Sequence, residues 1–446
     1  MIRWIVLGIW LVVPAVAWSQ GTDSASPPVL TLEQAIALAL QHNRLVQNAV
    51  FEVEKVADQR AAARTRRLPS LNFSLLESQL ITSVDFEFKR GAFGTFPTTG
   101  PIPPHDATIR TPRRLNTLVT GSAVQPISQL YRIGLGLQQL EAGQQIAQER
   151  LRLQRQSVAN EVKRAYYGLL QTQSALEAAE EALQFYQELD RTVGEQVAQQ
   201  QVLLFESLDV KPRLARAEYE IFTLRNALTS QKEQLNDFLG RDLRTHFQVG
   251  LVPTSTPLEV DLEAACARAL QQRPELKEAR LRVRQAEYDL RIKRSEYLPD
   301  ISLAFNYVSS YQVEVLPQNV ASVGLMVRWE LFDWGRKRRE LSEKGRAIQQ
   351  ANNEVDRAES LIVLDVNHRF RKLQESRELL RIGQLAQQAA RERVRVTRNR
   401  YTLQAALSQD LLQAQASLAE ANHQARQSLL SLWMARADFE KALGEE

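Results

Sequence analysis

Apolar and polar positions alternate with a period of two in four short runs of the chain. In the second half, apolar residues occupy every other position over residues 301–307 and again over 323–331. The first half has a less regular run that begins at Leu71 and a second one near residues 118–129, separated by a Gly-, Pro- and Thr-rich loop at 89–116. This alternation predicts four β-strands, each with one apolar face.

Much of the remaining chain has apolar residues at spacings of three and four, the pattern of helices that pack along a narrow seam. Two stretches of close to 70 residues contain no proline, and each predicts one helix about 100 Å long. Pro69 and Pro299 mark where the opening helices end, because a residue before proline leaves the α region. The predicted helices span residues 32–66, 133–201 and 210–239 in the first half and 262–296, 336–403 and 411–443 in the second.

The two halves of the chain are related by a duplication. The motif Leu-x-x-Ala-x-x-x-Ala-Leu begins at Leu32 and again at Leu262. The sequence therefore predicts two structural repeats, residues 31–247 and 262–446, each with an opening helix, a strand pair, a long helix and a return helix. A turn-rich linker, residues 248–261, joins them.

The lengths of the predicted helices fit one another. The opening helix of about 35 residues and the return helix of about 30 together match the long helix. Stacked end to end, the two short helices then pair along the long one, and the strand pair lies at one end of a rod. We predict a mainly α fold with a small β part, in which long antiparallel coiled coils carry four strands per chain.

Residues 1–19 differ from the rest in composition. A positive charge at Arg3 precedes an apolar stretch, and small residues permit cleavage before Gln20, so we predict a secretory signal peptide. Cys266 is the only cysteine, which excludes an intrachain disulfide, and no cysteine follows the cleavage site to carry a lipid anchor. Export without disulfides favours a periplasmic or outer-membrane location in a Gram-negative cell.

The rest of the composition carries few signs of chemistry. Lys plus Arg number 56 against 52 Asp plus Glu, and the mean hydropathy is −0.32. No nucleotide-binding glycine motif occurs and the five histidines are isolated, so we expect no cofactor, no metal and no enzymatic activity. The basic run 336–339 follows Trp329 and Trp334, and aromatic residues beside basic ones favour a membrane-interface anchor over nucleic-acid binding.

Four amphipathic strands of roughly 10–14 residues are long enough to cross a bilayer when tilted. A lipid-exposed sheet cannot have open edges, and bacterial barrels begin at about eight strands, so one chain cannot close a barrel alone. Three chains would supply twelve strands to one shared barrel. Two alternatives stay open on the residues alone: each strand pair caps a soluble coiled coil, or the chain is a periplasmic coiled-coil adaptor or scaffold without a pore.

Several motifs, in their order and spacing, resemble those of TolC-like outer-membrane channels, the exit ducts of tripartite efflux pumps and type I secretion systems. They are the shared opening of both repeats, Leu-Pro before the first strand, Trp329-Glu-Leu-Phe-Asp-Trp-Gly-Arg336, and Arg400-Tyr401 ahead of Asp410. The resemblance covers residues 31–443. It implies a homotrimer whose 12-stranded barrel in the outer membrane continues as a helical tunnel through the periplasm, served by a periplasmic adaptor and an inner-membrane transporter.

The resemblance also implies a periplasmic gate at the turns between the long and return helices. Asp209 matches the tip aspartate of the first repeat, Asp410 that of the second, and Tyr401 the gate tyrosine. Rings of carboxylates from three chains can select cations and hold a gate shut through hydrogen bonds. Capping of the return helices is an alternative role for both aspartates. The sequence departs from the family's pattern near the gate at Gln404, Ala406 and Gln413.

Overall fold

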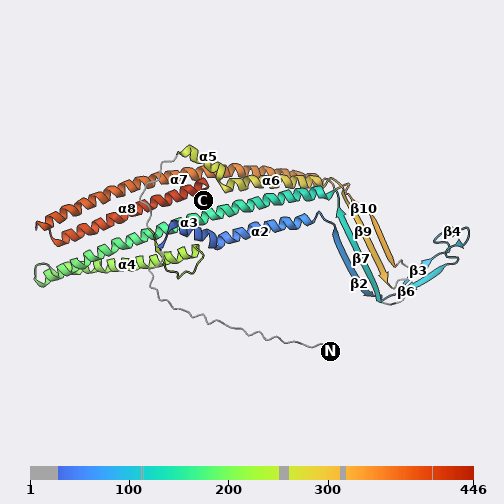
Figure 1. Ribbon diagram of the computed structural model, residues 1–446, viewed down its shortest axis with the longest axis horizontal. Helices are drawn as coiled ribbons and strands as arrows, with labels where there is room; N and C mark the ends of the chain where they lie inside the picture. The colour runs from blue at the N-terminus through green and yellow to red at the C-terminus, as the bar shows by residue number, and fades with distance from the viewer. Residues whose placement is uncertain are drawn as a thin grey trace, which may run out of the picture.

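The computed structural model describes residues 29–111, 113, 115–250, 261–311, 318–403 and 405–445. The molecule is a long rod in which helices run side by side and strands extend from one end (Figure 1). Residues 1–19, the expected signal peptide, lie outside the described residues. Across the described ranges, no helix has an apolar stretch long enough to cross a membrane.

The helices occur in the predicted order, and the fold is mainly α with a small β part, as the sequence predicts. The first half contains α1 (Leu32–His42), α2 (Arg44–Thr65), α3 (Gln129–Ala198) and α4 (Leu204–Phe238). The second half contains α5 (Leu262–Gln272), α6 (Pro274–Ser295), α7 (Arg336–Thr402) and α8 (Ser408–Leu443).

Each opening helix is divided in two, at Asn43 and at Arg273, where the sequence predicted one continuous helix. Asn43 is buried and extended; its Oδ1 accepts the N–H of Leu45 at 2.9 Å and its Nδ2 donates to the carbonyl of Phe238 at 3.0 Å. It therefore caps α2 and ties it to the end of α4. Arg273 precedes Pro274, and proline moves the residue before it out of the α region.

Two short helices flank each long one, as the helix lengths predict. Helix α3 packs against α2 on the side of the strands and against α4 toward the far end, and α7 does the same with α6 and α8 (Figure 1). Helix α3 also packs against α6 and α8, so it joins the two halves of the chain. The helices thereby form one continuous wall.

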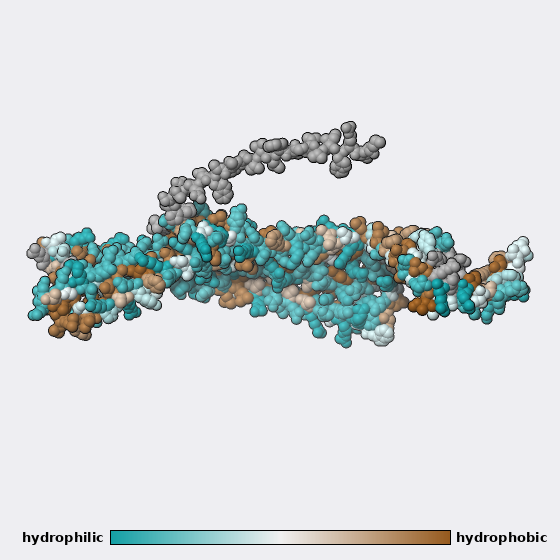
Figure 2. All heavy atoms as spheres, turned by 90° about the horizontal axis from the view of Figure 1, so that it is seen from below, coloured by the Kyte–Doolittle hydropathy of each residue, from teal (hydrophilic) through white to brown (hydrophobic). Residues whose placement is uncertain are grey.

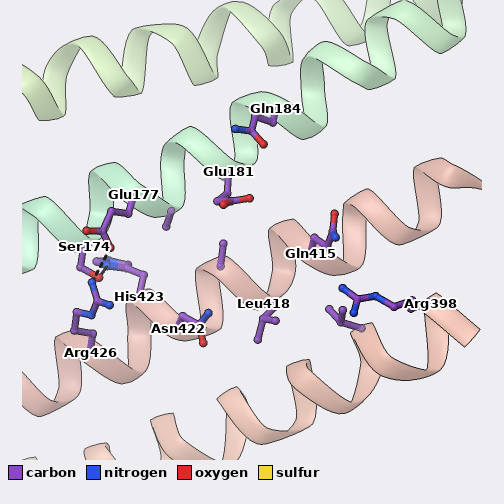
Figure 3. Close-up of a pocket in the computed structure, with 13 residues that line it drawn as sticks. Ser174, Glu177, Glu181, Gln184, Arg398, Gln415, Leu418, Asn422, His423 and Arg426 are labelled. Carbon is purple, nitrogen blue, oxygen red and sulfur yellow. Dashed lines mark hydrogen bonds and ion pairs between the residues drawn. The ribbon is translucent and has the colours of Figure 1, made fainter. Parts of the chain in front are cut away.

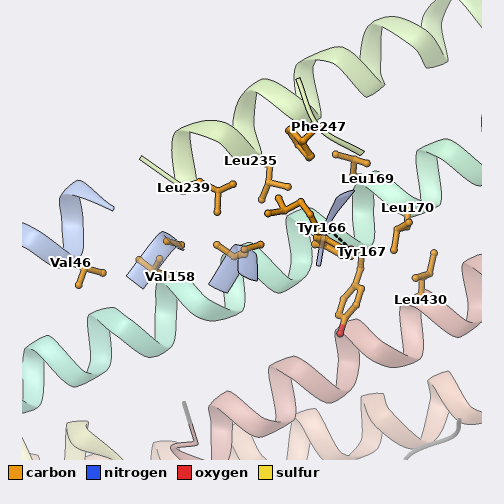
Figure 4. Packing of buried hydrophobic residues seen from close by; sticks show 14 residues of the cluster. Val46, Val158, Tyr166, Tyr167, Leu169, Leu170, Leu235, Leu239, Phe247 and Leu430 are labelled. Carbon is orange, nitrogen blue, oxygen red and sulfur yellow. Dashed lines mark hydrogen bonds between the residues drawn. The ribbon is translucent and has the colours of Figure 1, made fainter. Parts of the chain in front are cut away.

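The core consists of two clusters where α1 and α5 lie against the long helices. In the first, Ala35 and Ala39 of α1 are fully buried in a cluster that includes Val158, Tyr166 and Leu169 of α3 (Figure 4). In the second, Ala265 and Ala269 of α5 take the same place against α7. Alanine at these positions lets the helices approach closely, and burial of apolar area there stabilises the crossing.

A two-residue parallel ladder connects the start of the described chain to the middle. Strand β1 (Val29–Leu30) pairs with β8 (Gln248–Val249). The hydroxyl of Tyr166 lies 2.9 Å from the carbonyls of Leu30 and Gly250 and binds both segments to α3. The expected linker thus begins with a strand, and its residues 251–260 lie outside the described residues.

The four predicted strands form one antiparallel sheet. They are β2 (Ser70–Gln79), β7 (Leu115–Pro126), β9 (Asp300–Tyr311) and β10 (Asn319–Arg328). Their order is β10-β9-β7-β2, so the β7–β9 pair joins the two halves, and β2 and β10 are left as open edges. Among the described residues, no strand pairs with the backbone groups along these two edges.

The prediction of a loop at residues 89–116 was partly wrong. Part of this range forms short strands of a small hairpin that extends beyond the four-stranded sheet. Strand β3 (Val84–Phe88) pairs with β6 (Ala107–Thr111), and β4 (Thr95–Phe96) pairs with β5 (Gly100–Pro101). The β3–β6 pairing depends on contacts about twenty residues apart, such as the 3.0 Å ion pair between Arg110 and Asp85. Such pairing leaves only a weak local signal in the sequence.

Candidate functional site

The hydrogen-bond register sorts the side chains of the four-stranded sheet into two faces. Phe73 lies opposite Gly121, Gly121 opposite Tyr307, and Tyr307 opposite Ala321, while the next residue along each strand points the other way. We call the face that contains Phe73, Gly121 and Tyr307 the apolar face. Its members include Leu71, Phe73, Leu75, Val119, Ala123, Ile301, Leu303, Phe305, Val323, Leu325 and Val327.

The apolar face is open to the surroundings in the single chain. Leu71 is 78% exposed, Phe73 75% and Val323 71%. Figure 2 shows hydrophobic residues near the strands and at the opposite end of the rod, while the sides between are mostly hydrophilic. Large apolar residues in such numbers on one sheet face indicate a surface that meets lipid or another chain.

The other side of the sheet, which we call the hydroxyl face, has small uncharged polar groups interspersed with apolar residues such as Leu76, Val308 and Met326. Ser74 and Thr120 lie opposite each other, and their hydroxyl oxygens are 2.6 Å apart. A face of this kind suits water-filled space rather than hydrocarbon. Its polar members include Ser70, Asn72, Ser74, Thr120, Ser122, Ser302, Asn306, Ser310 and Ser322.

Charged residues are rare in this sheet, and only one on the hydroxyl face is unpaired. Asp300 accepts two hydrogen bonds from Arg132 at 3.2 Å. Arg328, directly opposite Asp300 on β10, is exposed and makes no side-chain hydrogen bond or ion pair in the described part of the chain. The sequence analysis missed Arg328, although it is the only Lys or Arg in the four strands and its place in the alternation assigns it to the polar side.

The predicted interface residues lie where β10 turns into α7. Trp329 is 55% exposed and continues the alternation of the apolar face, and Trp334 is 87% exposed. Positive φ angles at Trp334 and Gly335 turn the chain into the helix. The carboxylate of Asp333 caps that helix, and a hydrogen bond from the backbone N–H of Lys337 holds the pKa of Asp333 below its usual range.

At the far end of the rod, the α3–α4 and α7–α8 turns lie at the same end (Figure 1). Asp410 accepts the backbone N–H of Leu407 at 3.0 Å and so caps α8. Asp209 does not cap its helix: α4 begins at Leu204, and Asp209 instead pairs with Arg213 at 2.6 Å. The acidic residue in the first turn of α4 is Glu206, so the capping role expected for Asp209 was wrong.

The three gate residues are not bonded to one another in the single chain. Tyr401 is 43% exposed in the last turn of α7, and no hydrogen bond or ion pair joins it to Asp209 or Asp410 among the described residues. Gln404 lies outside the described residues. Gln413 and Ala406 line a shallow hollow together with Asp410.

Comparison with known proteins identifies the family. The family model for outer membrane efflux proteins matches residues 35–241 and 265–445. The chain belongs to this family. It is therefore an outer-membrane channel, the exit duct of an efflux pump or of a type I secretion system, rather than a coiled-coil adaptor.

Individual relatives of this outer membrane efflux protein are distant in sequence. Alkaline protease secretion protein AprF of Pseudomonas aeruginosa is 24% identical over 421 residues, which cover 89% of this chain and 81% of AprF. The CmeC outer membrane channel of Campylobacter jejuni is 16% identical with a TM-score of 0.74, over 99% of this chain and 94% of CmeC. VceC of Vibrio cholerae is 17% identical with a TM-score of 0.69, over 93% and 96%. These structures share the fold.

A polar hollow of about 620 Å³ lies beside α3 and α8 of this efflux protein (Figure 3). Within it, His423 Nδ1 lies 3.4 Å from the hydroxyl of Ser174, and Arg426 forms a 2.7 Å ion pair with Glu177. No carboxylate bonds to the His423 ring in the described ranges, so the Ser–His contact lacks the third group that orients a catalytic base. Those same ranges contain no cluster of three or more potential metal ligands.

Proposed function

We propose that three copies of this chain share one 12-stranded barrel that crosses the outer membrane and continues as a helical tunnel into the periplasm. The observation that carries the proposal is the four-stranded sheet, which has two open edges, one apolar face and one hydroxyl face. Open edges are too costly in hydrocarbon, and four strands cannot close on themselves. Pairing of β2 with β10 of a neighbouring chain would satisfy both edges.

The dimensions of the apolar face agree with this placement. From Ile301 to Tyr311, β9 spans about 33 Å along its length, and tilted by about 45° it covers roughly 23 Å, near the height of an outer-membrane barrel's apolar band. Trp329 lies at the helix-side border of that band and Tyr311 at the opposite border. We propose that Trp329 and Trp334 anchor the barrel at the periplasmic interface.

The proposed duct is passive. Residues 1–19 would direct export, and an inner-membrane transporter with a periplasmic adaptor would supply energy and docking. AprF is by name a protease secretion protein, and the matching family model is that of outer membrane efflux proteins, so both protein secretion and efflux are open to this chain. The hydroxyl face supplies a polar lining for the conduit and requires no cofactor.

Gel migration of the detergent-extracted outer membrane, with and without heating, tests the assembly. A trimer that resists detergent and dissociates only on heating is expected, because barrel closure pairs every strand edge. Recovery of the chain as a soluble periplasmic monomer contradicts the proposed function.

We also propose that Asp209, Tyr401 and Asp410 contribute to a closed periplasmic tip in the trimer. Support comes from their common place at the far end of the rod and from the exposure of Tyr401. Asp410 can cap α8 and face the tip at once, because a carboxylate accepts several hydrogen bonds.

Single-channel conductance in a planar bilayer tests the gate. The double variant Tyr401→Phe, Asp410→Asn is expected to conduct at least about twofold more than the parent, because two contacts that hold the tip closed are lost. Asn retains an acceptor for the Leu407 N–H, so the start of α8 is preserved. The matched control is Glu206→Gln, which removes a carboxylate at the same end. Unchanged conductance in the double variant removes these residues from the gate.

A further inference from the structure

A hollow of about 430 Å³ lies between α2 and α3, next to the strands. Three arginines line it: Arg60 and Arg64 of α2, and Arg67 in the turn that directly follows the helix. Arg60 and Arg64 are four residues apart and so lie on one side of α2, and the backbone N–H of Arg67 bonds to the Arg64 carbonyl at 3.1 Å. Arg67 is three residues before the first residue of β2, so the hollow begins where the sheet meets the helices.

The hollow has more positive charge than its own carboxylate balances. Arg60 pairs with Glu141 at 3.0 Å, while its Nε is buried without a partner. Neither Arg64 nor Arg67 uses its guanidinium in a hydrogen bond or ion pair with the described residues. The hollow is therefore lined by two exposed guanidinium groups, those of Arg64 and Arg67, that no carboxylate of the described residues balances.

The Arg67 side chain reaches across to α3. A side-chain carbon built on Gly134 would lie 3.9 Å from Nη2 of Arg67, an ordinary van der Waals distance. The Arg67 guanidinium therefore lies against α3 at Gly134, where an alanine would also fit.

Helix geometry shows which way the hollow opens. Arg132 reaches Asp300, which belongs to the side of the hydroxyl face. Tyr131, Gly134 and Gln138 line the hollow, and at about 100° per residue they point between roughly 100° and 160° away from Arg132. The hollow therefore opens on the side of the apolar face, outside the channel wall. Tyr131 is 60% exposed at its rim.

We propose that this hollow binds the phosphate headgroup of an anionic phospholipid in the periplasmic leaflet of the outer membrane. Arg64 and Arg67 would bind the phosphodiester through their paired N–H groups, while Arg60 stays paired with Glu141. Tyr131 and the half-exposed Leu130 lie where the glycerol and first acyl carbons would begin. This inference rests on the proposed function, since it requires the sheet to lie in the membrane.

Native mass spectrometry of the full-length chain in detergent, with equal amounts of phosphatidylglycerol and phosphatidylcholine, tests the site. The parent is expected to retain phosphatidylglycerol preferentially, and Arg64→Gln with Arg67→Gln is expected to reduce that preference about tenfold, because two charge-assisted contacts are lost. The matched control is Arg66→Gln. Arg66 is next to Arg67 but lines a separate hollow, which it shares with Arg132, so this variant should retain the parent's preference.

Three results would decide against the inference. Equal lipid preference in the parent and the double variant overturns it, and so does an equal loss in Arg66→Gln. If inorganic phosphate displaces phosphatidylglycerol and stabilises the parent to the same extent as the lipid, the hollow is instead a site for small anions. The same spectra report assembly: a chain that is only monomeric contradicts the proposed function, whereas a trimer without lipid preference contradicts this inference alone.

Discussion

At the scale of single residues, two glycines decide how the return helices end. Gly240 follows α4 with φ +66°, and a side-chain carbon there would lie 2.3 Å from the carbonyl oxygen of His42. Gly444 follows α8 with φ +84°, and its added carbon would meet the backbone of Arg273 at 3.2 Å. In both halves the return helix therefore ends directly against the break in the opening helix, and only glycine fits there.

Gly240→Ala is expected to destabilise the helical wall. The left-handed φ alone costs a non-glycine residue about 1–2 kcal/mol, and the contact with the His42 backbone adds to this. The midpoint of thermal unfolding, followed by circular dichroism of the detergent-solubilised chain, measures the effect. Gly194→Ala is the control, since it lies inside α3 with no atom within 4 Å and alanine favours a helix by about 1 kcal/mol. Equal midpoints for the two variants contradict this account.

At the scale of elements, strand β2 places opposite chemistries side by side. Phe73 lies on the apolar face, and Asn72 lies on the hydroxyl face beside Ser122 of β7. Because side chains alternate, a shift of one residue would exchange the two environments for the whole strand. We therefore expect a charged substitution on the apolar face to disturb the sheet, and one on the hydroxyl face to be tolerated.

Phe73→Lys is expected to prevent assembly of the barrel, while Asn72→Lys is expected to permit it. A lysine on the lipid side near the bilayer centre costs about 2–4 kcal/mol, whereas a lysine on the lumen side remains in water. The amount of heat-dissociable trimer in isolated outer membranes measures the difference. Similar trimer yields from the two variants would show that the faces have been assigned wrongly.

At the scale of the whole molecule, a trimer would turn single charges into rings. Arg328 lies on the hydroxyl face at the end of β10, so three copies would encircle the lumen where the barrel meets the helical tunnel. At the far end, Asp209 is already paired with Arg213, which weakens its field. The Arg328 ring is therefore a strong candidate for charge selection in the barrel.

Arg328→Ser is expected to shift ion selectivity toward cations. Removal of three unpaired positive charges from a narrow lumen lowers the local concentration of anions. The reversal potential of single channels under a KCl gradient measures the shift, and it should diminish at high salt as screening increases. Asn306→Ser, a neutral change on the same face, serves as the control. A reversal potential equal to that of the parent places Arg328 outside the conducting path.

Local patterns were sufficient for most elements but failed where distant segments meet. The 3- and 4-residue periodicity predicts the long helices α3 and α7 to within a few residues, because each is stabilised along its own length. The break at Asn43 depends on the Phe238 carbonyl, 195 positions away in the chain, and no local pattern contains that contact. The hairpin β3–β6 was missed for a similar reason.

The sequence alone determined the class of the protein, because the order and spacing of its repeated motifs and its alternating strands resemble those of outer-membrane channels. The tertiary structure decided which side each residue faces. The alternation already puts Arg328 on the polar side of its strand, but only the register of the sheet places it opposite Asp300. Only the packing of α2 on α3 gathers the three arginines of the proposed lipid site. The physical reason is that periodicity encodes which residues share a face, whereas the identity of that face depends on long-range pairing.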